Sequence, residues 1–169
     1  MVINLKGLIN GDSKVIPVNA ELDFTNEEYA GEKLLSKPVI VSGEIRNKAD
    51  VTELLLNCDV VVNKPCDRCG VMTEKKFQIP INRVLVTNLE DEDNDNIDLL
   101  LLENEQLDLY EVCFSEILLA LPMKHLCSEA CKGVCPVCGK NLNKQSCNCE
   151  TKSVDPRLEV LLQLLKDED

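Results

Sequence analysis

The stretch from Thr52 to Val62, TELLLNCDVVV, has the period-two pattern of a half-buried β-strand. Its apolar positions fall on one face, and they are Leu54, Leu56, Cys58, Val60 and Val62. The polar side chains of Glu53, Asn57 and Asp59 lie mostly on the other face. The stretch therefore predicts a strand with one side packed on a core.

The segment before this strand carries the same pattern. After Pro38, one face holds Val39, Val41, Gly43 and Ile45, and the other holds Ser42, Glu44 and Arg46. Residues 2–18 alternate more loosely and predict one or two short strands with a turn at Asn10-Gly11-Asp12. The polar residues 19–37 are expected to form a connection.

A third strong strand is predicted from about Val71 to Thr87, with Phe77, Ile79 and Ile81 inward. Val84 and Val86 have the opposite parity, which predicts a bulge or bend near Arg83. Because short links join these strands, the pattern favours an antiparallel sheet or a small open barrel over a parallel sheet.

Two helices are expected after the strands. Asp108, with Glu111 three residues later, resembles a capping box, and Pro122 ends a helix of about 108–121. Asp155-Pro156 begins a C-terminal helix with a leucine stripe, which docks on the body or, alternatively, binds a partner. The acidic run EDEDNDNID at 90–98 indicates a solvated loop, since it lacks the glycine of a calcium-binding loop.

These elements predict an α+β protein in two parts. A β-rich antiparallel body with the middle helix is expected over residues 1–122. A Cys-rich zinc-binding module and the C-terminal helix are expected over residues 123–169.

The composition is ordinary for a globular protein, and it limits the cellular location and the kinds of partner to be expected. The 169 residues are 44% hydrophobic and 28% charged, and no export signal or run of eighteen apolar residues occurs, which favours a cytoplasmic protein without membrane contact. The formal net charge of −12 disfavours sequence-blind binding to a phosphate backbone. Residues 64–83 and 124–152 are exceptions, since each stretch holds five basic and two acidic side chains.

The ten cysteines divide into two core residues and eight candidate metal ligands. Cys58 and Cys113 lie on apolar faces and are expected in the core. The other eight match two four-cysteine zinc sites, because zinc readily takes four thiolates in a tetrahedron, so one or two structural zinc ions are expected. Site 1 is expected to contain Cys135, Cys138, Cys147 and Cys149, and site 2 Cys66, Cys69, Cys127 and Cys131.

Several alternatives stay open for these cysteines. Cys131 and Cys135 could exchange sites, and disulfides, another metal or an iron–sulfur cluster could replace zinc. Cys66 and Cys69 could form a redox pair, although no βαβ pattern surrounds them. His125, the single histidine, could replace a cysteine as ligand, but a surface or structural role is favoured.

No catalytic motif appears in the sequence. Clustered cysteine pairs favour closed structural zinc sites, whereas catalytic zinc keeps an open position. There is no phosphate-binding loop and no dinucleotide fingerprint. We therefore expect a binding protein without a small-molecule substrate, not an enzyme.

The ordered motifs resemble one bacterial family over nearly the whole chain. They are Cys66-Asp67-Arg68-Cys69, Leu121-Pro122-Met123 leading to Leu126-Cys127, the run from Cys131 to Asn143, Cys147-Asn148-Cys149 and Asp155-Pro156-Arg157-Leu158. This combination resembles the YceD family of large ribosomal RNA subunit accumulation proteins. His125 stands where the family pattern has proline before Leu-Cys.

The resemblance implies a cytoplasmic role in synthesis, processing or stability of large-subunit ribosomal RNA, without a known catalytic activity. The implied partner is ribosomal RNA or a large-subunit ribosomal protein. Lys75, Lys76, Lys132, Lys140 and Lys144 are candidates for contact, or they only solvate the surface. The alternative function is a redox- or zinc-sensing regulator that uses the same cysteines.

Overall fold

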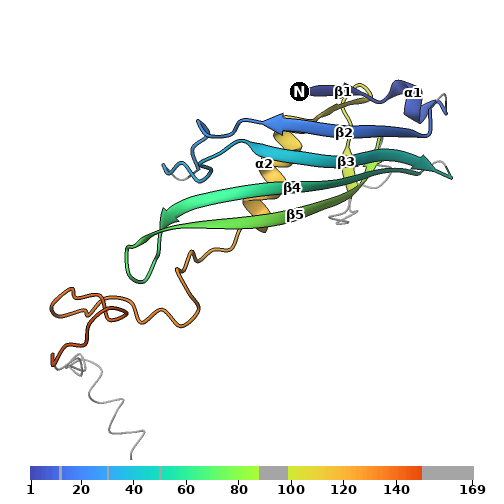
Figure 1. Ribbon diagram of the computed structural model, residues 1–169. Helices are drawn as coiled ribbons and strands as arrows, with labels where there is room; N and C mark the ends of the chain where they lie inside the picture. Colours follow the sequence, from blue (N-terminus) through green and yellow to red (C-terminus); the bar gives the residue numbers. More distant parts are fainter. Residues whose placement is uncertain (12, 30, 50, 88–98, 150–169) are drawn as a thin grey trace, which may run out of the picture. The chain divides into compact units, whose positions relative to one another are not determined.

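The computed structural model describes residues 1–149 except 12, 30, 50 and 88–98 (Figure 1). The expected C-terminal helix and the acidic run at 90–98 lie outside the described residues. The elements are β1 (Val2–Asn4), α1 (Lys6–Ile9), β2 (Val15–Leu22), β3 (Val39–Lys48), β4 (Val51–Pro65), β5 (Met72–Val86), β6 (Leu99–Leu101), β7 (Gln106–Asp108) and α2 (Leu109–Ala120).

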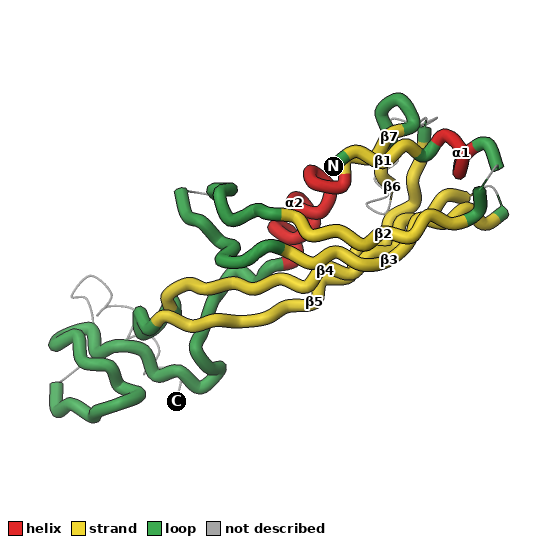
Figure 2. The backbone as a smooth tube through the Cα atoms, turned by 45° about the horizontal axis from the view of Figure 1, so that its top comes forward, coloured by secondary structure: helices red, strands yellow, loops and turns green. Residues whose placement is uncertain are grey.

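A five-stranded sheet in the order β2-β3-β4-β5-β6 forms the body, and β1 and β7 form a separate antiparallel pair. β3 pairs antiparallel with both β2 and β4, whereas β6 runs parallel to β5. The long strands twist together and α2 lies against one side of them (Figure 2). The expected α+β class is confirmed, and the sheet curls like half a barrel. The expected antiparallel sheet is mixed, because β6 runs parallel to β5.

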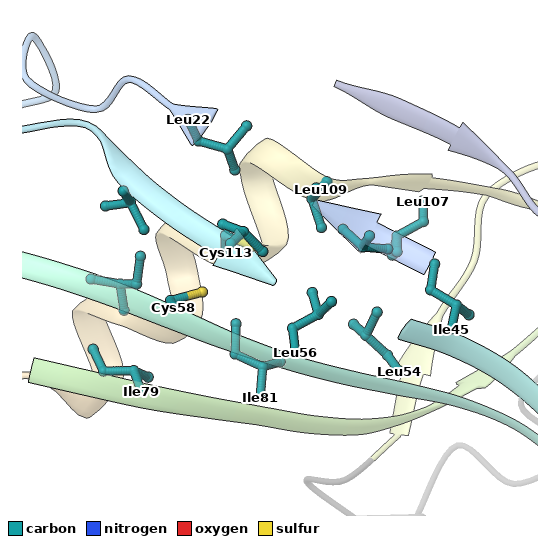
Figure 3. Packing of buried hydrophobic residues seen from close by; sticks show 14 of the residues in the cluster. Leu22, Ile45, Leu54, Leu56, Cys58, Ile79, Ile81, Leu107, Leu109 and Cys113 are labelled. Carbon is teal, nitrogen blue, oxygen red and sulfur yellow. The ribbon is translucent and has the colours of Figure 1, made fainter. Parts of the chain in front are cut away.

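The alternation in the sequence corresponds to the two faces of the sheet. Val39, Val41 and Ile45 of β3 are fully buried, and every expected inward residue of β4 is buried with them. These side chains converge between the sheet and α2 (Figure 3). The apolar face predicted from Thr52–Val62 is therefore the core face.

The change of inward parity near Arg83, from which a bulge or bend was expected, does not occur. Leu85 is buried, as are Ile79 and Ile81, so the inward parity continues along β5. Val84 is partly buried and lies opposite Leu99 of β6. Arg83 keeps the inward parity because it reaches α2, where its Nη2 lies 2.7 Å from Glu116 Oε2. Because the charged Arg83 occupies a core-facing position, the apolar alternation in the sequence is interrupted there although the strand continues.

The N-terminal region differs in detail from the expectation. β1 and β2 are the expected short strands, but the single helical turn α1 lies between them, and β2 extends into the stretch expected as a connection. Phe24 follows β2 and is fully buried, with its ring centroid 4.5 Å from that of Tyr110 and 5.4 Å from that of Phe114. This aromatic group attaches the connection to α2.

The middle helix begins as predicted. The Asp108 carboxylate accepts a hydrogen bond from the Tyr110 N–H at 3.0 Å, which satisfies a free donor of the first turn. Cys113 of α2 is fully buried, and so is Cys58 of β4, so both are core residues as expected (Figure 3). Hydrogen bonding to Cys58 and burial raise the pKa of the Cys113 thiol, which keeps it protonated.

The chain divides into two compact units. The sheet unit contains Met1–Lys64 and Met72–Lys124, and the Cys unit contains Pro65–Val71 and the chain from His125 onward. The segment 65–71 joins β4 to β5, so the Cys unit includes a piece that lies far from residue 123 in the sequence. Among the described residues, no helix combines the length and hydrophobicity needed to cross a membrane.

Candidate metal centres

The two Cys-x-x-Cys-Gly segments form the same tight turn. The Gly70 N–H donates to the Cys66 carbonyl at 2.8 Å, and the Gly139 N–H donates to the Cys135 carbonyl at 2.9 Å. The φ angles of the two glycines are +70° and +71°. In both turns the N–H groups two and three residues further on point at the sulfur of the first cysteine. Each turn thus presents a pair of thiols together with donors that stabilise a thiolate.

Four sulfurs meet at the first turn. The Cys66 cluster consists of Cys66, Cys69, Cys127 and Cys131, and all its Sγ atoms lie within 4.8 Å of one another. Cys66 Sγ is 3.9 Å from Cys131 Sγ, and Cys69 Sγ is 3.7 Å from Cys127 Sγ. A tetrahedral zinc ion with zinc–sulfur bonds of about 2.3 Å places its ligand atoms about 3.8 Å apart. These two distances therefore match the spacing of ligand atoms around tetrahedral zinc.

The Cys135 cluster is formed within one short stretch of chain. Its members are Cys135, Cys138, Cys147 and Cys149, and their Sγ atoms also lie within 4.8 Å of one another. The Cys135 N–H donates to the Lys140 carbonyl at 2.8 Å, and the Leu142 N–H donates to the Gly133 carbonyl at 2.9 Å. These bonds close a small loop around the second turn. Cys135 is buried but Cys138 is exposed, so the Cys135 cluster opens toward solvent at one corner.

The thiol pKa values show how each cluster distributes its protons. Burial raises the pKa of the Cys66 thiol, but N–H groups of Cys127, Arg68 and Cys69 outweigh burial and lower it to about 6. The adjacent Cys131 sulfur, with burial, raises the pKa of Cys127 to about 12. Thus a cluster without metal holds both thiolates and thiols. A divalent cation favours four thiolates, so its binding must displace protons.

The Cys135 cluster repeats this division. The N–H groups of Cys138 and Val137 lower the pKa of Cys135 to about 6. A hydrogen bond with the Cys138 sulfur, together with burial, raises the pKa of Cys149 to about 12. In both clusters the pKa of the first cysteine of the tight turn is therefore lowered to about 6.

Polar contacts hold the two chain segments of the Cys66 cluster together. The Asp67 N–H donates to the His125 carbonyl at 2.8 Å, and the His125 N–H donates to Asp67 Oδ2 at 2.7 Å. Arg68 Nη1 donates to the Cys131 carbonyl at 2.9 Å and to the Glu129 carbonyl at 3.3 Å. The two residues between Cys66 and Cys69 thus fix the segment that carries the other two ligands.

Asn143 links the Cys66 cluster to the loop of the Cys135 cluster. Its Nδ2 donates to Cys131 Sγ at 3.3 Å, and its Oδ1 accepts from the Lys132 N–H at 2.8 Å. Asn141 Oδ1 accepts from both the backbone N–H and the Nδ2 of Asn143. Hydrogen bonds of this kind orient a metal ligand and tune its basicity. Asn143 is a supporting residue that the sequence analysis did not single out, although the closely spaced Asn141 and Asn143 are typical of a side-chain-stabilised turn.

The structure brings together the eight expected cysteines in the two expected sets. Cys131 joins the Cys66 cluster and Cys135 the other one, so their exchange does not occur. His125 is buried with 3% exposure and is not among the clustered ligands, which agrees with a structural role. That these clusters bind a metal ion stays a prediction.

The candidate contact lysines are divided between the units. Lys132, Lys140 and Lys144 are exposed side chains of the Cys unit. Lys75 and Lys76 are neighbours on β5 of the sheet unit. Successive side chains of a strand point to opposite faces, so these two cannot contact one surface together.

Comparison with known proteins identifies the family. The family model described as large ribosomal RNA subunit accumulation protein YceD matches residues 54–165. The chain belongs to the YceD family. The range shared with the YceD family includes all eight clustered cysteines, so the motifs that carried the resemblance lie inside the match.

A curated relative supports this assignment to the YceD family. The uncharacterized protein YlbN of Bacillus subtilis (strain 168) is 30% identical over 130 residues, which cover 74% of this chain and 75% of the relative. No solved structure matches the chain.

Proposed function

We propose that the chain is a non-enzymatic protein that holds two structural zinc ions and supports the accumulation of large-subunit ribosomal RNA in the cytoplasm. The observation that carries the proposal is the pair of four-thiol clusters within a chain of the YceD family. Zinc is the metal best suited to four thiolates in a tetrahedral arrangement. Four protein ligands fill the tetrahedron and leave no position for a substrate, which supports a structural role.

The proposed effect is on synthesis, processing or stability of large-subunit ribosomal RNA. The description of the family supports this effect, and we place direct contact with the RNA, or with a large-subunit ribosomal protein, at the Cys unit. Its described residues include four basic side chains, those of Arg68 and the exposed Lys132, Lys140 and Lys144. Their acidic side chains are those of Asp67 and Glu129. Two zinc ions, each with four thiolates, would bring negative charge of their own, so any RNA contact must come from local lysines and not from net charge.

The direct test combines genetics with metal analysis. Depletion of the protein in a bacterium that encodes it should lower the ratio of large-subunit to small-subunit ribosomal RNA, and the wild-type gene should restore that ratio. A Cys66→Ser/Cys69→Ser variant should fail to restore it and should lose one zinc ion per chain by elemental analysis. Depletion that leaves the RNA ratio unchanged would contradict the ribosomal role.

A second experiment addresses the contact. Crosslinking in growing cells followed by purification should recover large-subunit RNA precursors or ribosomal proteins with the wild-type chain. A Lys132→Ala/Lys140→Ala/Lys144→Ala variant should recover less, whereas a Lys6→Ala/Lys14→Ala/Lys33→Ala variant, which removes three exposed lysines of the sheet unit, is the control. Recovery of neither class of partner would argue strongly against the proposal.

The exposed Cys138 favours one alternative, a redox- or zinc-sensing regulator. A sensor requires a thiol that an oxidant reaches, and Cys138 is the exposed member of its cluster. Thiol titration of the purified, zinc-loaded protein separates the two functions. Inert thiols and tightly held zinc support the structural role, and rapid oxidation with zinc release supports the sensor.

A further inference from the structure

The sheet unit contains a groove whose lining residues belong to neither cysteine cluster. It has a volume of about 470 Å³ and is lined by β6, by β7 and by the side of α2 that bears Glu111, Val112 and Glu116. We call it the acidic groove. Its volume lies in the range of binding clefts, and its lining combines leucine and valine side chains with carboxylates.

The acidic groove has an uncompensated negative charge. Four carboxylates line it, those of Glu103, Asp108, Glu111 and Glu116, and no basic side chain is among its described lining residues. Asp108 is paired with the N-terminal ammonium at 3.1 Å, and Glu116 is paired with Arg83. Glu103 and Glu111 are exposed and form no ion pair within the described part of the chain. The groove thus offers two free carboxylates above an apolar surface.

One wall of the acidic groove is a sheet edge. β6 is the last strand in the sheet order, so only β5 pairs with it among the described strands. The Leu102 N–H donates to the Val86 carbonyl of β5 at 2.8 Å. Backbone groups of successive strand residues point in opposite directions, so the N–H and carbonyl of Leu101 point away from β5. The Leu101 side chain is 50% exposed and lines the groove.

We propose that the acidic groove binds an extended, lysine- or arginine-rich segment of a partner protein, which adds as a strand to the free edge of β6. Main-chain hydrogen bonds to Leu101 would supply affinity, as in other cases of strand addition. Alternate side chains of the segment would reach Glu103 and Glu111, and those between them would pack on Leu101 and Val112. The charge favours a basic peptide and repels a nucleic acid.

This inference concerns the sheet unit and does not depend on the metal clusters. It extends the proposed function, because it assigns a protein-binding surface separate from the lysines of the Cys unit. The two proposals can therefore fail independently.

The test uses the full-length, zinc-loaded chain and synthetic peptides. The probe is a fluorescein-labelled ten-residue peptide in which lysine alternates with valine, and the comparison peptide has glutamate in place of lysine. Fluorescence anisotropy at low and physiological salt should show binding of the basic peptide alone, weakened by salt. Amide chemical-shift changes should centre on 99–103 and on the first two turns of α2.

Two sets of variants separate charge from strand addition. The Glu103→Gln/Glu111→Gln variant should weaken binding about fivefold, because it removes both unpaired carboxylates. The matched Glu28→Gln/Glu32→Gln variant changes the net charge equally at exposed positions outside the groove and should leave binding within about twofold. Leu101→Pro removes the outward N–H and should weaken binding about tenfold, with the melting temperature measured as a check on folding.

A modified peptide keeps the strand-addition step testable if Leu101→Pro disturbs the fold. N-methylation of alternate peptide nitrogens blocks main-chain pairing with an unaltered protein, and it should weaken binding as Leu101→Pro does. Absence of binding at low salt would overturn the proposal. So would equal losses in the two glutamine variants, or full binding of the N-methylated peptide.

Discussion

Asn143 shows how one amide can connect the two cysteine clusters. It donates to Cys131 Sγ of the Cys66 cluster from the loop that closes the Cys135 cluster. We expect Asn143→Leu to lower zinc affinity at the Cys66 cluster by about 10- to 100-fold, because the Cys131 thiolate loses a donor. Competition with a chromophoric chelator measures this change, and the two zinc ions should leave in separate phases.

Gln145→Ala is the matched control for Asn143→Leu. It removes an exposed amide side chain two residues further on, which forms no hydrogen bond with the described residues, while the Gln145 N–H donates to the Asn141 carbonyl. Zinc release should stay as in the wild-type chain. Equal release rates in both variants would show that the Asn143 amide does not support the cluster.

At Gly43 the backbone of β3 leaves no room for a side chain against β4. The φ of Gly43 is +152°, and a Cβ atom there would lie 2.1 Å from the Leu55 carbonyl oxygen of β4. Gly43→Ala should therefore lower the free energy of unfolding by about 3 kcal/mol or more, because backbone must move. Urea unfolding followed by circular dichroism measures the loss, and Ser42→Ala on the outward face should change it by no more than about 0.5 kcal/mol.

At the scale of elements, one ion pair ties α2 to β5. Arg83 Nε and Nη2 donate to the two carboxylate oxygens of Glu116 at 2.8 and 2.7 Å, and the side chains are 22% and 17% exposed. A double-mutant cycle with Arg83→Met and Glu116→Gln should give a coupling energy of about 1 to 2 kcal/mol, since the pair is bidentate and partly buried. The exposed pair of Lys37 and Glu74 is the comparison, and we expect no measurable coupling there. Equal coupling in both pairs would contradict this role of burial.

The sequence predicted those elements whose pattern is local. β3, β4 and β5 alternate over many residues, and Asp108 and Pro122 mark the ends of α2, so each could be found without the fold. α1 is one turn long and β6 only three residues, which is too short for a period to show. β6 also depends on parallel pairing with β5, which local residues do not specify.

The clustered cysteines of the candidate site could be predicted from the sequence, but the residues that hold them in place could not. Eight cysteines in closely spaced pairs divide into two sets of four, and their spacing left open the membership of Cys131 and Cys135 and a ligand role of His125. Arg68 and Asn143 act through contacts that depend on where the chain folds back. A single sequence carries no periodic signal for such contacts.

At the scale of the whole molecule, the two units differ in what stabilises them. The large buried apolar cluster belongs entirely to the sheet unit, from Leu5 to Ile117. The buried residues described in the Cys unit are Cys66, His125, Cys131, Gly133 and Cys135, three of which are candidate ligands. A unit without an apolar core needs another source of stability, and a structural zinc site supplies about 10–16 kcal/mol.

Metal removal should therefore unfold the Cys unit and leave the sheet unit folded. With a chelator and a reductant, we expect amide hydrogen exchange in 65–71 and 125–149 to rise to nearly unprotected rates, while the strands that bury Val41, Leu54 and Ile81 stay protected. The net stability of a whole domain is about 5–15 kcal/mol, so loss of both zinc ions exceeds what the Cys unit retains. Cys135→Ser/Cys138→Ser should expose the 133–149 loop first, because the Cys66 cluster keeps its own four ligands. Protection that is lost at the same chelator concentration in β4 and in 133–149 would show that the two units share one cooperative core.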